Sequence, residues 1–261
     1  MTKFVTSADG TRIAYDRDGE GPAVILIGGA VQFRGFDPTT VEMARQLAGA
    51  DFTVINYDRR GRGESAEAKE FSLAHEIEDI ASLLDVAGGK AALYGSSSGG
   101  AIALAAAAAG LPVTKLALWE VPLGDELGAD GAAFLAGVRG RIAGGDGERV
   151  VEYYMKDMPP EWLEGAKQSP GWPVMVGIGP SLEPDAEALA WTQSAPRADL
   201  WSSVTQPTIA IIGEETIPIM PAAATSIVNA LPNAHLIRIP ALNHGWEPGV
   251  MAPVLAEFLA D

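Results

Sequence analysis

The chain contains no cysteine. Disulfide bonds, a thiol nucleophile and cysteine-ligated metal sites are therefore excluded. Without cysteines, the sequence does not indicate whether the protein works in an oxidising or a reducing compartment. Basic residues are also scarce, because 18 Lys and Arg face 34 Asp and Glu and give a net charge of −16 at pH 7. Nucleic acids and anionic membranes attract basic surfaces, so we expect neither of them as a partner.

Long apolar runs are missing as well. The longest run, residues 101–109, is mostly alanine, whereas a membrane-spanning helix needs about 18 apolar residues or more. Residues 1–9 contain a single Lys and no apolar stretch, which is unlike a secretory signal. No group of His, Asp or Glu has the spacing of a metal site. These absences predict a soluble, cytoplasmic protein without a metal ion.

The chain does have enough apolar material for a buried core, since 48% of its 261 residues are hydrophobic. Residues 2–17 alternate apolar and polar side chains around an Ala-Asp-Gly turn, which is typical of a β-hairpin. Further along, apolar runs typical of buried strands alternate with segments of helical spacing. We expect strands at 23–27, 52–57, 91–94, 114–119, 207–212 and 235–239, and helices at 39–48, 72–87, 98–109, 222–230 and 251–259.

This alternation of strands and helices predicts an α/β fold. Its sheet should be mostly parallel and covered by helices on both faces, with the hairpin adding antiparallel strands at one edge. The first helix should begin near Thr39, because Thr39 and Glu42 have the spacing of a capping box.

Residues 122–203 break the alternation. They contain four of the six tryptophans and only fragments of a helical pattern. A segment of this length inside an α/β domain is usually an insertion with a function of its own. We therefore expect a core made of residues 1–121 and 204–261, and a helical lid made of residues 122–203.

The peptide Gly95-Ser96-Ser97-Ser98-Gly99 fits the pattern G-x-S-x-G. A predicted strand leads into it and a predicted helix leads out of it. Such a strand–turn–helix lifts the central serine above the sheet, and the glycines let neighbouring backbone come close. The pattern therefore predicts Ser97 as a nucleophile beneath the lid. The alternative is an ordinary helix start that is capped by a serine.

The chain has three histidines. His75 falls on the polar side of a predicted helix, where a solvated side chain is expected, and His235 begins a predicted strand. His244 lies in the peptide Leu-Asn-His-Gly, between the last strand and the last helix. A loop there can bring a general base to Ser97, so His244 is the candidate base. A loop histidine that makes only a local turn bond is the alternative.

Over nearly its full length the chain resembles the α/β-hydrolase family. The resemblance rests on the Gly28-Gly29-Ala30 loop after the third strand, residues 58–65, the elbow at Ser97 and the loop of His244. Its Tyr-Asp-Arg-Arg-Gly-Arg-Gly peptide is similar to that of small actinobacterial-type members. The resemblance implies a mostly parallel eight-stranded sheet with flanking helices and hydrolytic serine chemistry, and it implies no particular substrate.

The resemblance also implies roles for single residues. His244 stands where the family has its general base. The family binds the oxyanion with one backbone N–H from the residue after the nucleophile, here Ser98, and with one from the loop after the third strand, here Ala30. Such donors contribute about 3 kcal/mol each in the transition state. Gly28 replaces the histidine that usually begins this loop, and a plain strand-end turn is the alternative.

The third member of a triad, the acid, is the difficult one. The family usually carries Asp at the position of Thr216. The acid could instead be Glu120, at the end of the sixth strand, where some members place it. Glu214 or Glu215 could also substitute, or the site could be a Ser–His dyad or inactive. We favour Glu120, because a carboxylate buried there without a partner would be costly, although a purely structural role is an alternative for it.

The insertion is rich in aromatic and methionine side chains, and its basic residues do not cluster. Some of these apolar side chains should therefore line a pocket over Ser97, while most form the packing core of the lid itself. Arg59, Arg60 and Arg62 could suggest a phosphate site. No P-loop and no G-x-G-x-x-G accompanies them, so pairing with nearby acids is the favoured interpretation.

These observations predict a cofactor-independent serine hydrolase. It would cleave a small apolar ester, lactone or thioester through an acyl-enzyme, as a monomer or homodimer. Two alternatives stay open. The missing Asp would suit a non-catalytic protein that binds a small ligand on the same fold, and the same site could serve a lyase, a cyclase or a haloperoxidase.

Overall fold

Eight strands form one sheet in the computed structural model, which describes residues 1–65, 68 and 70–260. The strand order is β1-β2-β4-β3-β5-β6-β7-β8. The pairs β1–β2 and β2–β4 are antiparallel and all other pairs are parallel, so the predicted sheet is confirmed. The strands are β1 (Lys3–Thr6), β2 (Arg12–Asp18), β3 (Ala23–Ile27), β4 (Thr53–Tyr57), β5 (Ala91–Ser96), β6 (Val113–Trp119), β7 (Thr208–Glu215) and β8 (Ala234–Leu242).

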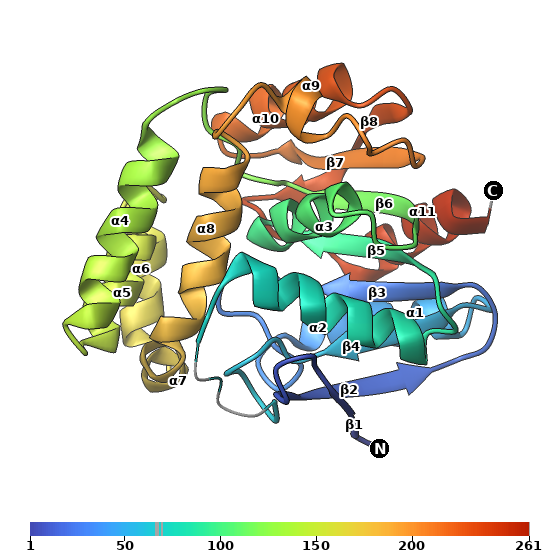
Figure 1. Cartoon of the computed structure of the whole chain (residues 1–261), viewed down its shortest axis with the longest axis horizontal. Helices are drawn as coiled ribbons and strands as arrows, with labels where there is room; N and C mark the ends of the chain where they lie inside the picture. The colour runs from blue at the N-terminus through green and yellow to red at the C-terminus, as the bar shows by residue number, and fades with distance from the viewer. Residues whose placement is uncertain (66–67, 69, 261) are drawn as a thin grey trace.

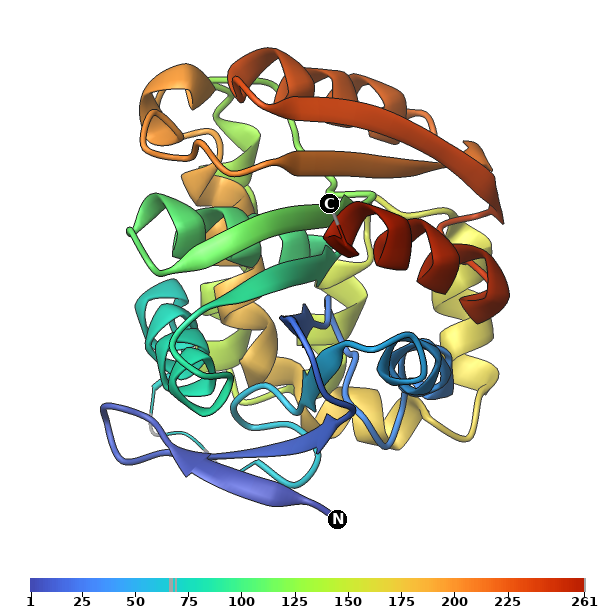
Figure 2. The same ribbon diagram turned by 90° about the vertical axis from the view of Figure 1, so that its right-hand side faces the viewer.

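Helices cover both faces of this sheet (Figure 1). Two of them, α1 and α11, lie side by side on one face, and α2 and α3 lie on the opposite face (Figure 2). Residues of α10 belong to the same buried cluster as those of α2 and α3. The helices are α1 (Pro38–Ala48), α2 (Leu73–Val86), α3 (Ser98–Ala108), α10 (Ile219–Ala230) and α11 (Pro248–Ala260).

The start of α1 differs from the prediction, because Asp37 and not Thr39 caps the helix. The Asp37 side chain accepts a hydrogen bond from the Thr40 N–H at 3.1 Å. Pro38 follows as the first helical residue, where its fixed φ suits the helix and its missing N–H costs nothing. Glu42 binds the Arg45 guanidinium on the helix surface, so it does not complete a capping box.

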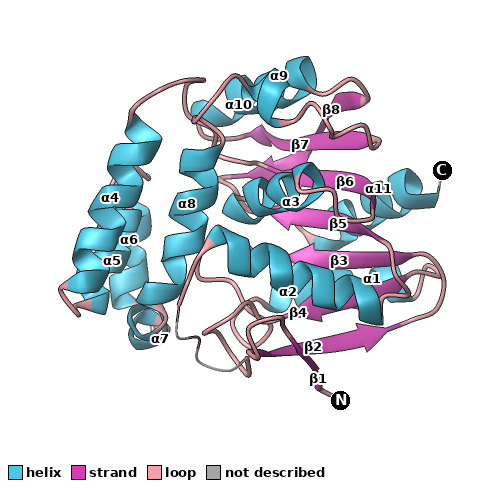
Figure 3. Ribbon diagram, in the orientation of Figure 1, coloured by secondary structure: helices cyan, strands magenta, loops and turns pink. Residues whose placement is uncertain are grey.

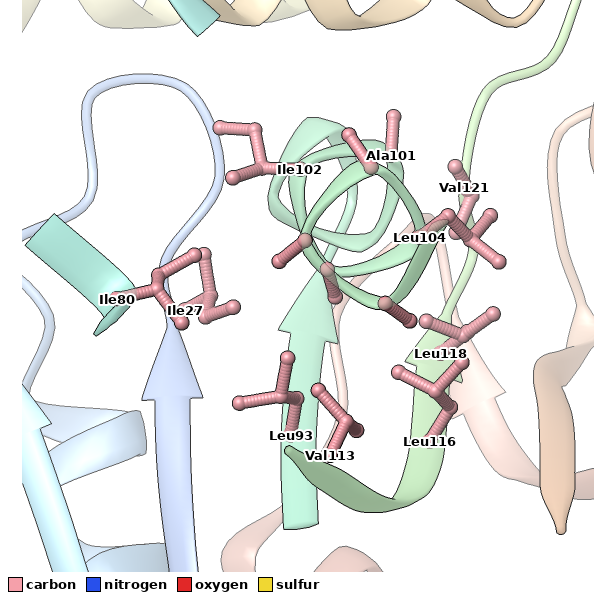
Figure 4. Close-up of a cluster of buried hydrophobic side chains, with 14 of the residues drawn as sticks. Ile27, Ile80, Leu93, Ala101, Ile102, Leu104, Val113, Leu116, Leu118 and Val121 are labelled. Carbon is pink, nitrogen blue, oxygen red and sulfur yellow. The ribbon is translucent and has the colours of Figure 1, made fainter. Parts of the chain in front are cut away.

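The centre of the core lies between α3 and the strands beneath it. Most of α3 consists of small residues, and Ser98–Ala107 are all buried. Small side chains allow the helix to approach the sheet closely, and the larger members Ile102 and Leu104 fill the space that remains. Figure 4 shows Leu93 of β5 and Leu116 of β6 in this cluster. Ser97 therefore directly precedes a helix that is buried against the sheet.

A helical insertion lies between β6 and β7. It stands at the end of the sheet toward which the arrowheads of the parallel strands point (Figure 3). It has a small apolar core of its own, which includes Val138, Val151 and Leu182. In the described part of the chain, no helix is long and apolar enough to cross a membrane. The insertion contains α4 (Asp130–Ala143), α5 (Gly147–Tyr154), α6 (Pro160–Gln168), α7 (Trp172–Gly177), the 3-10 turn η1 (Gly179–Leu182), α8 (Glu183–Trp191) and α9 (Arg197–Leu200).

Candidate active site

Ser97 occupies a sharp turn between β5 and α3. Its φ of 54° and ψ of −128° lie in a region that a residue with a side chain rarely adopts and that costs energy to hold. Two backbone hydrogen bonds fix the turn: the Ser97 N–H donates to the Trp119 carbonyl at 2.8 Å, and the Ser97 carbonyl accepts from the Gly100 N–H at 2.9 Å. The G-x-S-x-G pattern thus forms the strained turn that its context predicts.

The two glycines of the pattern are required by close contacts. A Cβ atom at Gly95 would lie 2.5 Å from the Gly100 Cα, and one at Gly99 would lie 2.5 Å from the Ile27 carbonyl oxygen. Both distances are too short for any side chain. The glycines therefore let α3 begin directly on top of β5 and β3, which brings the first turn of the helix to Ser97.

His244 is held at the tip of a two-residue hairpin. Leu242 and Gly245 exchange backbone hydrogen bonds in both directions, at 3.2 and 2.9 Å. Asn243 and His244 between them have φ values of 51° and 67°, as a type I′ turn requires. The Asn243 N–H also donates to the Glu215 carbonyl at 3.0 Å. The sequence predicts a loop here but not this turn, although an Asn before the histidine is a signal for left-handed backbone.

The structure brings Glu120 and His244 together. The His244 Nδ1 lies 2.5 Å from the Glu120 Oε2, and the other carboxylate oxygen accepts from the Gly213 N–H at 2.9 Å. The Glu120 side chain is fully buried, and that of His244 is 22% exposed. Burial alone would raise the pKa of Glu120, but the His244 ring, the Thr216 side chain and the Gly213 N–H hold this pKa below its ordinary value.

The other candidates for the acid have exposed side chains. Glu214 and Glu215 are exposed at the end of β7, whereas Glu120 directly follows β6, the neighbouring strand. Thr216, at the position where the resemblance places Asp, lies beside the Glu120 carboxylate. Of the candidates, Glu120 is therefore the carboxylate in contact with the histidine ring.

Two tryptophan rings lie nearly parallel to the His244 ring. Trp119 at the end of β6 has its ring centroid 6.3 Å away, and Trp162 of α6 has its centroid 6.2 Å away. The Trp119 Nε1 also donates to the His244 carbonyl at 3.3 Å. The sequence places Trp162 in the lid but gives no sign that it reaches the histidine. The insertion therefore brings an aromatic ring next to His244.

Ser97 and His244 line one cavity of about 560 Å³. Its wall combines the carboxyl-terminal edge of the parallel strands with the insertion. Charged members of the wall are few, and two of them, Lys156 and Asp157, form an ion pair with each other at 2.5 Å. A second, more open hollow of about 610 Å³ between α9 and α10 includes none of the candidate residues. The apolar members contributed by the insertion include Phe134, Tyr153, Tyr154, Met155, Trp162 and Met175.

The two candidate oxyanion donors are neighbours, but they are linked in an unexpected way. The Ala30 N–H donates to the Ser98 Oγ at 3.1 Å, and the Ser98 hydroxyl donates to the Asp185 Oδ1 at 2.6 Å. The backbone N–H of Ser98 belongs to the first turn of α3, where N–H groups have no partner within the helix. Neither the hydroxyl of Ser98 nor Asp185 of the insertion is indicated by the sequence pattern.

The three arginines of the loop after β4 pair with acids, as predicted. Arg59 contacts Glu76 and Asp185, at 2.9 and 2.7 Å. Arg62 contacts the second oxygen of Asp185 at 2.7 Å. Arg60 contacts Asp79 through two nitrogens, at 2.9 and 2.7 Å. All three guanidinium groups are buried, so this loop is built from internal ion pairs.

Replacing Arg60 by leucine should destabilise the fold strongly. Asp79 would be left buried without its cation, and such a loss costs about 3–5 kcal/mol. The free energy of unfolding in urea measures this effect. The matched control is Arg45→Ala, because the Arg45–Glu42 pair is exposed and exposed pairs contribute little to stability. Equal losses in the two variants would contradict a stabilising role for the buried pair.

A family model and a solved structure both relate this chain to alpha/beta hydrolases. The model of the alpha/beta hydrolase family matches residues 24–255. The chain is 34% identical to an alpha/beta hydrolase from Sphaerobacter thermophilus, with a TM-score of 0.82 over 98% of this chain and 99% of that one. No curated protein sequence matches it.

Two more distant structures share the fold. The first is a thermophilic esterase from Thermogutta terrifontis, at 22% identity and a TM-score of 0.68, with 94% of this chain and 91% of that chain covered. The second is an enol-lactonase from Burkholderia xenovorans, at 17% identity and a TM-score of 0.68, with 99% and 100% covered.

Proposed function

Because this chain belongs to the alpha/beta hydrolase family, we propose that it is a cofactor-independent serine hydrolase with Ser97, His244 and Glu120 as its triad. The observation that carries the proposal is the 2.5 Å contact between the His244 ring and the buried Glu120 carboxylate. A buried acid on one ring nitrogen fixes the tautomer and leaves the other nitrogen to act as a base. A protein that only binds a ligand has no need of this arrangement.

With these roles the proposed reaction proceeds in two steps. The Ser97 hydroxyl attacks the acyl carbon while His244 Nε2 takes its proton, and Glu120 stabilises the imidazolium that forms. Backbone N–H groups of Ser98 and Ala30 bind the oxyanion. The tetrahedral intermediate collapses, the leaving group takes the proton from His244, and Ser97 carries the acyl group. Water, activated by the same histidine, attacks this ester and releases the acid and free Ser97.

The unusual position of the acid is compatible with this role. Strands β6 and β7 are parallel neighbours, with Trp119 opposite Ile211, so residues just beyond their carboxyl ends meet at the same edge of the sheet. A carboxylate after β6 can therefore approach the histidine as well as one after β7. Glutamate also reaches one methylene further than aspartate, which helps Glu120 to span the gap.

The cavity supports a small, neutral, apolar acyl substrate. Its volume of about 560 Å³ is in the usual range for small-molecule sites, and its wall is mainly aromatic and aliphatic. The ion pair of Lys156 with Asp157 leaves no cationic group dedicated to an anion, and the net charge of −16 repels anions. We propose esters, lactones or thioesters of this kind as substrates.

The decisive test is covalent labelling by a fluorophosphonate probe, which reacts only with an activated serine. The wild-type protein should be labelled, and heat-denatured protein should not. A series of p-nitrophenyl esters of increasing acyl length then measures how much apolar chain the cavity accepts. Folded wild-type protein that resists the probe would point to a binding protein on this fold.

Replacing Trp162 by alanine should weaken the use of apolar esters. Its ring lines the cavity and stacks near the His244 ring, and such aromatic contacts contribute about 0.5–1.5 kcal/mol. We expect kcat/KM to fall roughly three- to tenfold, mainly through KM. Trp172→Ala is the control, because Trp172 packs within the insertion and outside the cavity wall. A larger loss in Trp172→Ala would show that lid packing, and not contact at the site, sets KM.

A further inference from the structure

The Ser98 hydroxyl connects the oxyanion loop to the insertion. A serine hydroxyl has one proton to donate and two lone pairs to accept with. Here the proton is committed to the Asp185 Oδ1 at 2.6 Å, so the hydroxyl can face the Ala30 N–H only as an acceptor, at 3.1 Å. The direction of the Ala30 N–H is thus set by a carboxylate on α8.

The same carboxylate also reaches the loop by a second route. Asp185 binds Arg59 and Arg62 through its two oxygens, each at 2.7 Å. These two arginines in turn donate to the carbonyls of Gly28 and Gly29, at 3.3 and 2.7 Å. The backbone on the amino side of Ala30 is therefore held by the cations that Asp185 orients.

These groups form a buried cluster without net charge. The side chains of Arg59, Arg62, Asp185 and Glu76 are each at most 1% exposed, and their two positive and two negative charges cancel. At low dielectric, such contacts are strong and permit little movement of the partners. Burial would raise the pKa of Asp185, but the two guanidinium groups and the Ser98 hydroxyl keep this pKa below its ordinary value, so Asp185 stays an anion.

We propose that Asp185 is a positioning residue for the oxyanion hole, and that it acts through the hydroxyl of Ser98. This inference rests on the proposed serine hydrolase function. In the free protein the Ala30 N–H donates to the Ser98 Oγ, and this hydrogen bond keeps the N–H directed toward the turn at Ser97. As negative charge develops on the substrate oxygen beside Ser97, that oxygen becomes the stronger acceptor and takes the N–H without rearrangement of the loop.

The lid takes part in ordering the loop of Ala30. Asp185 lies on α8, and Ser181, whose hydroxyl and carbonyl both accept from Arg62, lies on η1 just before it. The insertion is therefore not only a wall for the substrate. It also supplies the anion that orders the loop of Ala30, so a correctly docked insertion and a competent oxyanion hole occur together.

The test compares Ser98→Ala with Asp185→Asn. Ser98→Ala removes the hydroxyl but leaves the ion cluster and the Ser98 N–H in place, so it should fold. Asp185→Asn removes the anion and leaves a surplus buried cation, so its folding must be checked by circular dichroism. Glu187→Gln is the matched control, because Glu187 is a carboxylate of the same helix that binds the Leu73 N–H and Arg139 instead.

Two readouts separate positioning from general damage. In Ser98→Ala, kcat for p-nitrophenyl butyrate should fall roughly 10- to 100-fold, a part of the loss expected when one oxyanion donor is removed, while KM stays within about twofold. Binding of a trifluoromethyl ketone, whose adduct with Ser97 carries an oxyanion, should weaken by the same factor. A folded Asp185→Asn should behave alike, and Glu187→Gln should match the wild type.

The outcomes are distinct. If the wild-type protein is not labelled by a fluorophosphonate, the proposed function itself fails. If it is labelled, but Ser98→Ala keeps kcat and ketone affinity within about twofold of the wild type, the positioning role is wrong and the function stands. The role is also wrong if KM and kcat both change in Ser98→Ala while the variant binds the ketone as tightly as the wild type does. This result would indicate general distortion of the site.

Discussion

Replacing Ser97 by alanine is expected to lower the turnover of a short-chain ester by about 10⁶, the loss seen when a serine nucleophile is removed from a triad. Alanine keeps the Cβ atom, so the packing around the elbow and the left-handed backbone at this position change little. The variant should therefore fold as the wild type does, and lose only the oxygen that attacks the substrate.

His244→Ala should cost a similar factor, and the double variant should cost hardly more than either single one, because nucleophile and base act as one unit. Burst kinetics with p-nitrophenyl acetate and fluorophosphonate labelling measure both effects. Circular dichroism and the unfolding midpoint serve as controls for folding. Most of the wild-type activity surviving in Ser97→Ala would refute the elbow assignment, and losses that simply multiply in the double variant would show that His244 does not act as the base for Ser97.

The part of this site that the sequence predicts is the part encoded locally. The elbow needs a strand, a turn and a helix in direct succession, and the peptide around Ser97 contains all of them. The same is true of the loop position of His244. Each depends on residues within a few positions of one another, so strand pattern and glycine spacing are enough to predict them.

The part that the sequence does not predict depends on distant segments. Asp185 is 87 residues from Ser98 and 126 from Arg59, and it meets them only because α8 docks on the core. The lack of a phosphate-binding motif predicts that the arginines pair with acids. It does not predict which acids they pair with. At α1, a prediction from local spacing was also wrong. The capping-box spacing predicts a start at Thr39, but Asp37 caps the helix and Pro38 is its first residue.

The acid is an intermediate case. The resemblance places it at Thr216, which cannot carry a charge, so three alternatives remained from the sequence. The favoured candidate, Glu120, follows a buried strand at the edge of the sheet where His244 lies, and its carboxylate is 2.5 Å from the His244 ring. Adjacent parallel strands end side by side, as β6 and β7 do here, so a carboxylate at the end of either strand can approach the histidine.

Glu120→Gln should therefore lower kcat by up to about 10⁴, the size of loss known for a triad acid that is replaced by its amide. The amide can still accept the Gly213 N–H, so the fold should be kept, but it cannot stabilise the imidazolium. Glu214→Gln and Glu215→Gln are the matched controls, since both side chains are exposed and should have little effect. A greater loss in either control would move the acid to β7.

Adding Thr216→Asp to Glu120→Gln should restore part of the lost activity. Thr216 lies beside the Glu120 side chain, at the end of the strand next to β6, so a carboxylate there can approach the same ring nitrogen. We expect kcat to recover at least about tenfold over Glu120→Gln alone, about 1.4 kcal/mol of transition-state stabilisation. Thr216→Asn in the same background supplies an amide of equal size and should restore nothing. Equal recovery in both double variants would mean that shape, and not charge beside His244, limits the reaction, and the triad would then reduce to a Ser97–His244 dyad.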